Sequence, residues 1–428
     1  MAQRLFTSAS FNIEIRWQNN SLRNSMGVAV FYSLKVGRRP HWLAVVMCLL
    51  FNTQLHATQF SWFQPDLDWL SYVNAIGAGN RAFGPSWIGG LELDGQTNEF
   101  VPKGRESPSR LGMPLVAFDT SSDVVTGLPP SQYQINSVTL TMTMASATFP
   151  SEFIFYDDTP DTQAEVLADI QSGSFDSQRP MELYGVGFRE GYIGFEFAVP
   201  ASDPVLLDES TQIYGASDGG YLAYPISSDA TGQPLDVSNS ITGGFSETAP
   251  ANTTPPFDPV PWSIGTTSLS VGAAIPDDTT FTFDVNLAEP GVLDYVQQGL
   301  ANGEMGFFVS SLTLAAQPGL GIFPYPQWYL KESGGGAVNG IPPTLEIDVT
   351  ISGDFDEDGD VDSFDLAEWQ LRYGVDSGAD ADSDNDSDGE DFLIWQKNYT
   401  GSGALVATLV VPEPASIFLI TTILVSPI

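Results

Sequence analysis

The sequence is poor in thiols, imidazoles and bases. Its one cysteine and two histidines, Cys48, His41 and His56, all lie within the first 56 residues. If that segment is removed, the mature chain has no disulfide, no thiolate-bound or histidine-bound zinc, no cysteine nucleophile and no triad with a histidine base. Any catalysis would then depend on carboxylates, tyrosine, serine with lysine, arginine or a metal.

Positively charged residues are also few. The 428 residues hold 15 lysines and arginines against 53 acids, which leaves a net charge of -38. A phosphate backbone would be repelled, so nucleic acid is excluded as a partner. The length allows two or three domains with a sizeable core.

The N-terminal part has the pattern of an export signal. Three bases at positions 35–39 precede the apolar run 42–51, and the small residue Ala57 follows shortly after. This order predicts that 1–57 is a leader with a signal peptide, cleaved after Ala57. Met26 offers an internal start that would give a leader of ordinary length. A membrane anchor is the alternative, but ten apolar residues fall short of the ~20 that span a bilayer.

The segment 354–391 carries sixteen acids and one base, Arg372. Such a run is typical of a solvated tail, but here the acids alternate with other residues. Calcium requires six to eight oxygen ligands, which a twelve-residue loop supplies from alternate positions around a turn at Gly359. We expect Asp360 to contribute its backbone carbonyl, and Val361 to point inward and pair with a neighbouring loop. The predicted ligands of this first loop are Asp354, Asp356, Asp358, Asp360, Asp362 and Asp365.

A second loop follows, and its register has two alternatives. With Gly389 at the turn, Trp395 would occupy the twelfth position, where an oxygen ligand is required. With Asn385 at the turn, every ligand position is an aspartate, and asparagine tolerates the left-handed conformation. The second register therefore predicts the ligands Asp380, Asp382, Asp384, Asp386, Asp388 and Asp391.

The same register aligns the residues that follow each loop. Trp369 and Trp395 correspond at an offset of 26 residues, and so do Tyr373 and Tyr399. The segment 352–400 is therefore an internal duplication, each half being a loop and an amphipathic helix. The apolar residues at helical spacing are Leu366, Trp369 and Tyr373 in one half, and Phe392, Trp395 and Tyr399 in the other.

This tandem resembles a type I dockerin, a paired calcium-loop module that docks onto cohesin domains and is common beside polysaccharide-degrading enzymes. The resemblance implies two bound Ca²⁺ ions, a small all-α pair of EF-hand-like loops and a cohesin-like protein partner. Two alternatives remain open: a structural calcium clip without a partner, and an acidic spacer that binds no ion.

The C-terminal segment 401–428 consists of a linker and an apolar tail. Its motif VPEPAS opens a twelve-residue apolar run and resembles the PEP-CTERM sorting signal of bacterial envelope proteins. The resemblance implies export and recognition by a membrane sorting enzyme. The motif residues are Val411, Pro412, Glu413, Pro414, Ala415 and Ser416.

The body, 58–351, is rich in glycine, proline, serine, threonine and aromatics. Period-two alternation predicts strands at 135–144, 281–287 and 344–351, with further candidates at 114–120, 152–156, 182–189, 192–197 and 306–314. Short helices are expected at 162–171 and 291–300, the second with Val292 and Val296 on one face. The segment 247–261 is a rigid linker or long loop. Many short strands with glycine and proline between them predict a β-sandwich, similar to a jelly roll.

The predicted fold is mainly β, a jelly-roll-like β-sandwich body followed by the small all-α tandem. We expect an exported calcium-binding protein of non-enzymatic binding or structural type, located in the cell envelope or extracellular matrix of a bacterium and in contact with an extracellular polysaccharide. The alternative is a polysaccharide hydrolase or lyase that carries a dockerin. No catalytic residue is assigned, because 52 acids after residue 57 offer no means of selecting a pair.

Overall fold

The structure is a computed structural model. The predicted leader 1–57, the first ten residues of the loop 247–261 and the sorting tail 401–428 lie outside the described residues. Among the described residues, no helix combines the length and the apolar character needed to cross a bilayer. The described residues are 58–63, 65–69, 81–83, 91–93, 100–102, 114–145, 154–162, 164–165, 168, 178–197, 203–208, 222–237, 257–310, 326–331 and 341–400.

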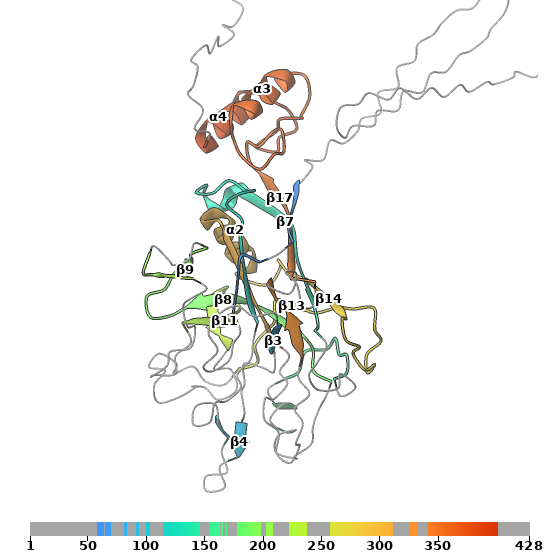
Figure 1. The fold of residues 1–428 in the computed structure, drawn as a ribbon. Helices are drawn as coiled ribbons and strands as arrows, with labels where there is room; N and C mark the ends of the chain where they lie inside the picture. The colour runs from blue at the N-terminus through green and yellow to red at the C-terminus, as the bar shows by residue number, and fades with distance from the viewer. Residues whose placement is uncertain are drawn as a thin grey trace, which may run out of the picture. The chain divides into compact units, whose positions relative to one another are not determined.

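The fold is mainly β and almost wholly antiparallel, with few helices (Figure 1). One sheet has four strands in the order β1-β17-β7-β14, and another has seven, in the order β12-β11-β8-β15-β6-β2 with β13 paired to β8. The described residues also form three two-stranded pairs: β9 with β10, β3 with β16, and β4 with β5. The strands are β1 (Thr58–Trp62), β2 (Leu67–Trp69), β3 (Arg81–Phe83), β4 (Leu91–Leu93), β5 (Phe100–Pro102), β6 (Leu115–Asp119), β7 (Tyr133–Thr143), β8 (Glu182–Phe188), β9 (Gly194–Phe195), β10 (Leu206–Leu207), β11 (Ala223–Ser228), β12 (Pro234–Asp236), β13 (Ser263–Ile264), β14 (Thr280–Asp284), β15 (Glu304–Ser310), β16 (Gln327–Tyr329) and β17 (Thr344–Ile351).

The four-stranded sheet follows directly from residue alternation. β7 and β17 pair antiparallel along the whole of β17, with one bulge between Asp348 and Val349. Apolar side chains of both strands enter the core, while the opposite face carries threonines and acids that bond across strands, as in Thr139 Oγ1 to Asp284 Oδ1 at 2.9 Å. The buried residues of the two strands are Tyr133, Val138, Leu140, Met142, Thr143, Leu345, Ile347, Val349 and Ile351.

Helix α2 (Val292–Asn302) covers part of the core between β7 and β15. Val292, Val296 and Leu300 are fully buried on one face, which confirms the predicted shared face. Tyr295 fixes the helix to the seven-stranded sheet, because its hydroxyl donates to the carbonyl of Gly306 at 2.7 Å. One hydrophobic core draws residues from both large sheets and from α2.

Most predicted strands are confirmed. Two of them, at 192–197 and 152–156, are shorter than predicted or are replaced by an isolated bridge. The strand expected at 344–351 is β17, and those at 114–120, 135–144 and 182–189 are formed with small shifts at their ends. The strand expected at 281–287 is β14, which ends at Asp284. Of the strand expected at 306–314, β15 contains 306–310, and 311–314 lie outside the described residues. Of 192–197 only Gly194 and Phe195 pair, because the turn at Glu190 and Gly191 precedes them. In 152–156 the described residues make an isolated bridge, Phe155 with Ala274, rather than a strand.

Three further helices are short. They are η1 (Pro130–Gln132), α3 (Ser363–Arg372) and α4 (Gly389–Asn398). Of the helix predicted at 162–171 the structure describes helical backbone at 164, 165 and 168.

A buried carboxyl lies in the seven-stranded sheet. Glu182 is 1% exposed and accepts a hydrogen bond of 2.7 Å from the hydroxyl of Tyr184. Burial raises the pKa of Glu182 to about 8. Burial also raises the pKa of Glu304, which accepts from the N–H of Phe195 at 2.7 Å, to about 7. Both groups therefore favour the protonated form in the folded chain.

The variant Glu182→Gln tests this interpretation. Because the folded pKa of about 8 exceeds the ordinary 4.5, Glu182 contributes stability that is complete below pH 4.5 and is lost as the pH rises to 8. Over this window the wild-type free energy of unfolding should fall relative to the variant, by about 1 kcal/mol per pH unit. Urea denaturation of both proteins measures the difference. Glu304→Gln should show the same effect in a window that ends near pH 7, and a parallel pH profile for wild type and Glu182→Gln would contradict the prediction.

Candidate metal centre

Residues 354–365 and 380–391 form two equivalent loops, which we call loop 1 and loop 2. Loop 1 leads into α3 and loop 2 leads into α4. In both loops the fourth and sixth positions have the left-handed backbone conformation, so Asn385 occupies the turn of loop 2 as the second register predicts. The φ angles are 62° at Glu357 and 99° at Gly359 in loop 1, and 66° at Ser383 and 74° at Asn385 in loop 2.

The first aspartate of each loop accepts hydrogen bonds from the backbone of the turn. This arrangement bends the loop so that its first carboxylate faces the later positions. In loop 1, Asp354 accepts from the N–H groups of Asp358 and Gly359 at 3.1 and 3.0 Å. In loop 2, Asp380 accepts from Asp384 and Asn385 at 3.1 and 2.8 Å.

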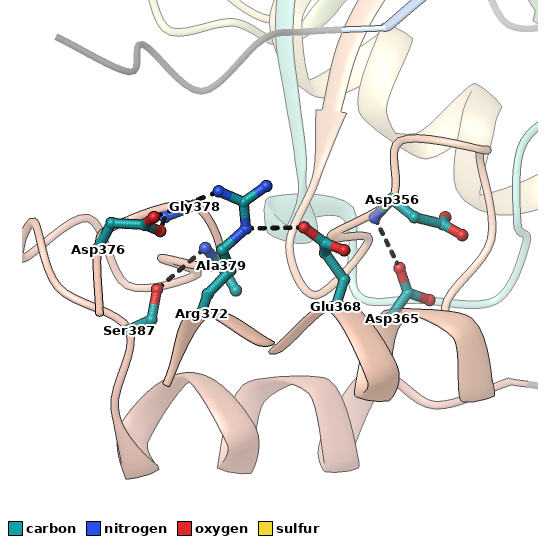
Figure 2. A network of polar contacts seen from close by, with 8 residues as sticks. All are labelled: Asp356, Asp365, Glu368, Arg372, Asp376, Gly378, Ala379 and Ser387. Atoms are coloured by element: carbon teal, nitrogen blue, oxygen red, sulfur yellow. Dashed lines mark hydrogen bonds and ion pairs between the residues drawn. The ribbon is translucent and has the colours of Figure 1, made fainter. Parts of the chain in front are cut away.

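The last aspartate of each loop closes it and starts the helix. Asp365 accepts from the N–H groups of Phe355 and Asp362 at 2.6 Å each. It also accepts from the N–H of Asp356 at 3.1 Å, the bond drawn in Figure 2. Asp362 caps the N-terminus of α3 and forms a capping box with Asp365. Loop 2 repeats every bond: Asp391 accepts from Ala381, Asp388 and Asp382 at 2.6, 2.6 and 3.4 Å, and Asp388 with Asp391 forms the capping box of α4.

The carboxylates converge on this last aspartate. In each loop two groups of three have ligand oxygens that all lie within 4.8 Å of one another, and both groups include the twelfth position. Asp358 and Asp384 are not in these groups, and their carboxylates accept from the N–H groups of Asp360 and Asp386 at 3.2 and 3.1 Å. The groups are Asp354 with Asp356 and Asp365, Asp360 with Asp362 and Asp365, Asp380 with Asp382 and Asp391, and Asp386 with Asp388 and Asp391.

Burial and the neighbouring negative charges raise the pKa values of several of these carboxyl groups. Burial raises the pKa of Asp354 to about 8, and the negative charge of Asp365 acts in the same direction. Burial also raises the pKa values of Asp356 and Asp365 to about 6. In loop 2 the pKa values of Asp382 and Asp386 are raised, first by desolvation and then by neighbouring carboxylates. A divalent cation among these oxygens would relieve the repulsion.

The donor set suits calcium. The grouped side chains are all carboxylates, hard oxygen donors at alternate positions around a tight turn, and the groups contain neither sulfur nor nitrogen donors. Magnesium requires near-ideal octahedral geometry and keeps several of its waters, which suits so dense a set of carboxylates less well.

The segment between the two halves is held by Arg372, the one base in 354–391 (Figure 2). Its guanidinium bonds Glu368 at 2.7 Å and Asp376 at 3.3 Å. Asp376 in turn accepts from the N–H of Gly378 at 2.9 Å, so this connection leads directly to the start of loop 2.

The two halves are joined by reciprocal hydrogen bonds. The indole N–H of Trp369 donates to the carbonyl of Asp388 at 2.8 Å, and that of Trp395 donates to the carbonyl of Asp362 at 2.7 Å. Each tryptophan thus bonds the helix start of the other half. Aromatic contacts connect α3 to α4, with ring centroids 5.0 Å apart between Trp369 and Phe392. This exchange is an approximate two-fold symmetry, which the 26-residue offset alone did not reveal.

The prediction for Val361 is half right. Its side chain is buried, as expected, but its carbonyl accepts from the N–H of Thr400 at 3.0 Å rather than from loop 2. The equivalent carbonyl of Ser387 accepts from Gly374 at 2.8 Å, again across the two halves. The hydroxyl of Ser387 is buried and accepts from the N–H of Ala379 at 3.0 Å, which explains why a polar residue is tolerated there.

Three tryptophans and one lysine of the body make structural contacts. Trp62, Trp262 and Trp328 are buried in the core, so these three rings cannot stack on a ligand at the surface. Lys331 donates to the carbonyl of Asp66 at 2.8 Å.

Comparisons of the chain with protein-family models, curated proteins and solved structures found no match.

The variant Trp395→Phe tests the reciprocal bonds. It removes the indole N–H that donates to the carbonyl of the half-buried Asp362, which should lower the free energy of unfolding of the tandem by about 1 kcal/mol. Trp369→Phe is the matched variant, and we expect a smaller loss because Trp369 is only half-buried. Chemical denaturation followed by far-ultraviolet circular dichroism measures both. A larger loss for Trp369→Phe would contradict the asymmetry.

Proposed function

We propose that this chain is an exported calcium-binding protein of non-enzymatic binding or structural type. In this proposal 352–400 is a dockerin-like tandem that holds two Ca²⁺ ions, and the mainly β body is a jelly-roll-like β-sandwich. The observation that carries the proposal is the convergence of carboxylates on Asp365 and on Asp391 in two symmetry-related loops. The shared core of the two large sheets supports the sandwich.

Each ion would be held by the aspartates at alternate positions of one loop, closed by Asp365 or Asp391. Calcium supplies positive charge that offsets the mutual repulsion of these side chains. The chain supplies a turn with the required left-handed backbone and a helix start that fixes the last carboxylate. Extracellular calcium, at roughly 10⁻³ M, would saturate even weak sites of this kind.

A protein partner is part of the proposal. Phe364 and Leu371 are 67% and 70% exposed, and they lie seven residues apart, on one side of α3. This apolar surface supports docking onto a cohesin-like protein. The motif at Val411–Ser416 supports recognition by a membrane sorting enzyme and location in the cell envelope or extracellular matrix.

An extracellular polysaccharide is the second proposed partner. An open hollow of about 600 Å³ lies beside the edge strand β14 and is lined largely by hydroxyl side chains, among them Thr266, Ser268 and Thr280. Hydroxyls both donate and accept hydrogen bonds, as sugars do. These observations do not select a pair of catalytic carboxylates, and the proposal therefore keeps the body as a binding module.

Isothermal titration calorimetry tests the calcium sites. The wild-type chain should bind two Ca²⁺ ions, and Asp365→Ala and Asp391→Ala should each bind one. Asp376→Ala removes an equal charge from the same tandem but lies outside both loops, so it should still bind two. The absence of heat with the wild-type chain, with circular dichroism equally unchanged, would refute the proposal.

A polysaccharide panel tests the body. The full chain in calcium should be retained on at least one polysaccharide without releasing new reducing or unsaturated ends. The double variant Ser268→Ala and Thr280→Val removes two hydroxyls of the hollow and should weaken retention several-fold. Released ends that disappear when a pair of carboxylates is replaced would instead establish a hydrolase or lyase.

A further inference from the structure

Although the two halves of the tandem are duplicates, their surroundings differ. Gly359 at the turn of loop 1 is buried, whereas Asn385 at the same position of loop 2 is exposed. Asn398 in α4 is 1% exposed, whereas the side chain of its equivalent in α3, Arg372, is 41% exposed. One face of the tandem, formed by the turn of loop 1 and the end of α4, is therefore covered, and its symmetry mate is open.

The covered turn is bonded to the body. The N–H of Val125 donates to the carbonyl of Gly359 at 2.8 Å, and the hydroxyl of Thr58 donates to the carbonyl of Glu357 at 3.3 Å. A Cβ atom at position 359 would lie 2.3 Å from the carbonyl oxygen of Asp123. Glycine is therefore required here both by its φ of 99° and by this close approach.

The end of α4 supplies the second attachment. The amide of Asn398 donates to Gln132 Oε1 and to the carbonyl of Ser352, both at 2.8 Å. Val361 and Trp395 belong to the same hydrophobic core as the body strands. Gln132 immediately precedes β7, and Ser352 immediately follows β17, so this attachment reaches two strands of the four-stranded sheet.

The turn of loop 2 has no such attachment among the residues described. The hydrogen bonds given for its turn, from Asp384, Asn385 and Asp386, all end on aspartates of the same loop. The start of loop 2 lies nearer the body, since Asp380 and Ala381 line a small hollow together with Gln134 and Thr350. The later contacts with the body are made by α4, one and two turns after Asp391, through Trp395 and Asn398.

We propose that the ion site of loop 1 is coupled to the folding of the body, whereas the site of loop 2 chiefly stabilises the tandem. The inference rests on the proposed calcium binding and assigns different roles to two nearly identical sites. A ligand that binds only the folded state stabilises whatever unfolds together with its site. Loop 1 begins three residues after β17 and contacts Val125 and Thr58, so loosening it would release contacts to the body.

The experiment compares Asp356→Ala with Asp382→Ala in the full chain. Both aspartates are exposed, occupy the third position of their loops and belong to equivalent carboxylate groups, which makes the two variants a matched pair. Hydrogen exchange read by mass spectrometry reports on peptides from β1, β7 and β17, with and without calcium. Calorimetry on the same samples gives the number of ions bound.

We expect each variant to bind one ion fewer than the wild type. Calcium should slow exchange in β1 and β17 several-fold in the wild type and in Asp382→Ala, and this slowing should largely disappear in Asp356→Ala. Equal losses in the two variants, or two bound ions without any effect on these strands, would overturn the coupling and leave calcium binding standing. No binding by the wild-type chain would overturn both.

The variant Phe60→Ala tests the contact itself. The Phe60 ring lies against the turn of loop 1, 2.8 Å from where a Cβ of Gly359 would be, and the substitution touches no carboxylate. The chain should still bind two ions, but the calcium-dependent slowing in β17 should shrink. The readout is the difference made by calcium, so a general loss of body stability does not mimic the result. An unchanged difference would contradict the proposed route.

Discussion

The repulsion among aspartates that share one centre is the constraint on which the tandem depends. Asp365 and Asp391 each accept three backbone N–H groups, complete a capping box and face four other carboxylates of their loops. In loop 1, burial raises the pKa of Asp365 and the charge of Asp356 acts in the same direction, while the three hydrogen bonds favour its ionised form. The same side chain thus fixes the helix start and the point where the carboxylates converge, so that in the proposed function loop shape and ion binding depend on one residue.

Much of this centre could be predicted because its geometry is local. The spacing of aspartates within twelve residues, the left-handed turn at Asn385 and the offset between Trp369 and Trp395 depend on covalent neighbours and on a repeated pattern. The same holds for Val138, Leu140 and Met142, whose alternation on β7 is independent of what the strand contacts.

The contacts that decide the role of each half were not predictable, because they join residues far apart in the chain. Asn398 meets Gln132, and Gly359 meets Val125, across separations of more than two hundred residues. One signal was present in the sequence: the turn is glycine in loop 1 and asparagine in loop 2. Both residues adopt positive φ, but only glycine admits another backbone so closely, so the difference between duplicates points to a neighbour.

Gly359 also fixes the order of the two halves along the chain. An array whose halves were interchangeable could be shuffled, extended or reversed by recombination without penalty. A half with asparagine at its turn cannot replace the first half next to the body, because the asparagine Cβ would collide with the carbonyl of Asp123. The order of the two halves along the polypeptide is therefore constrained by sterics at this one turn.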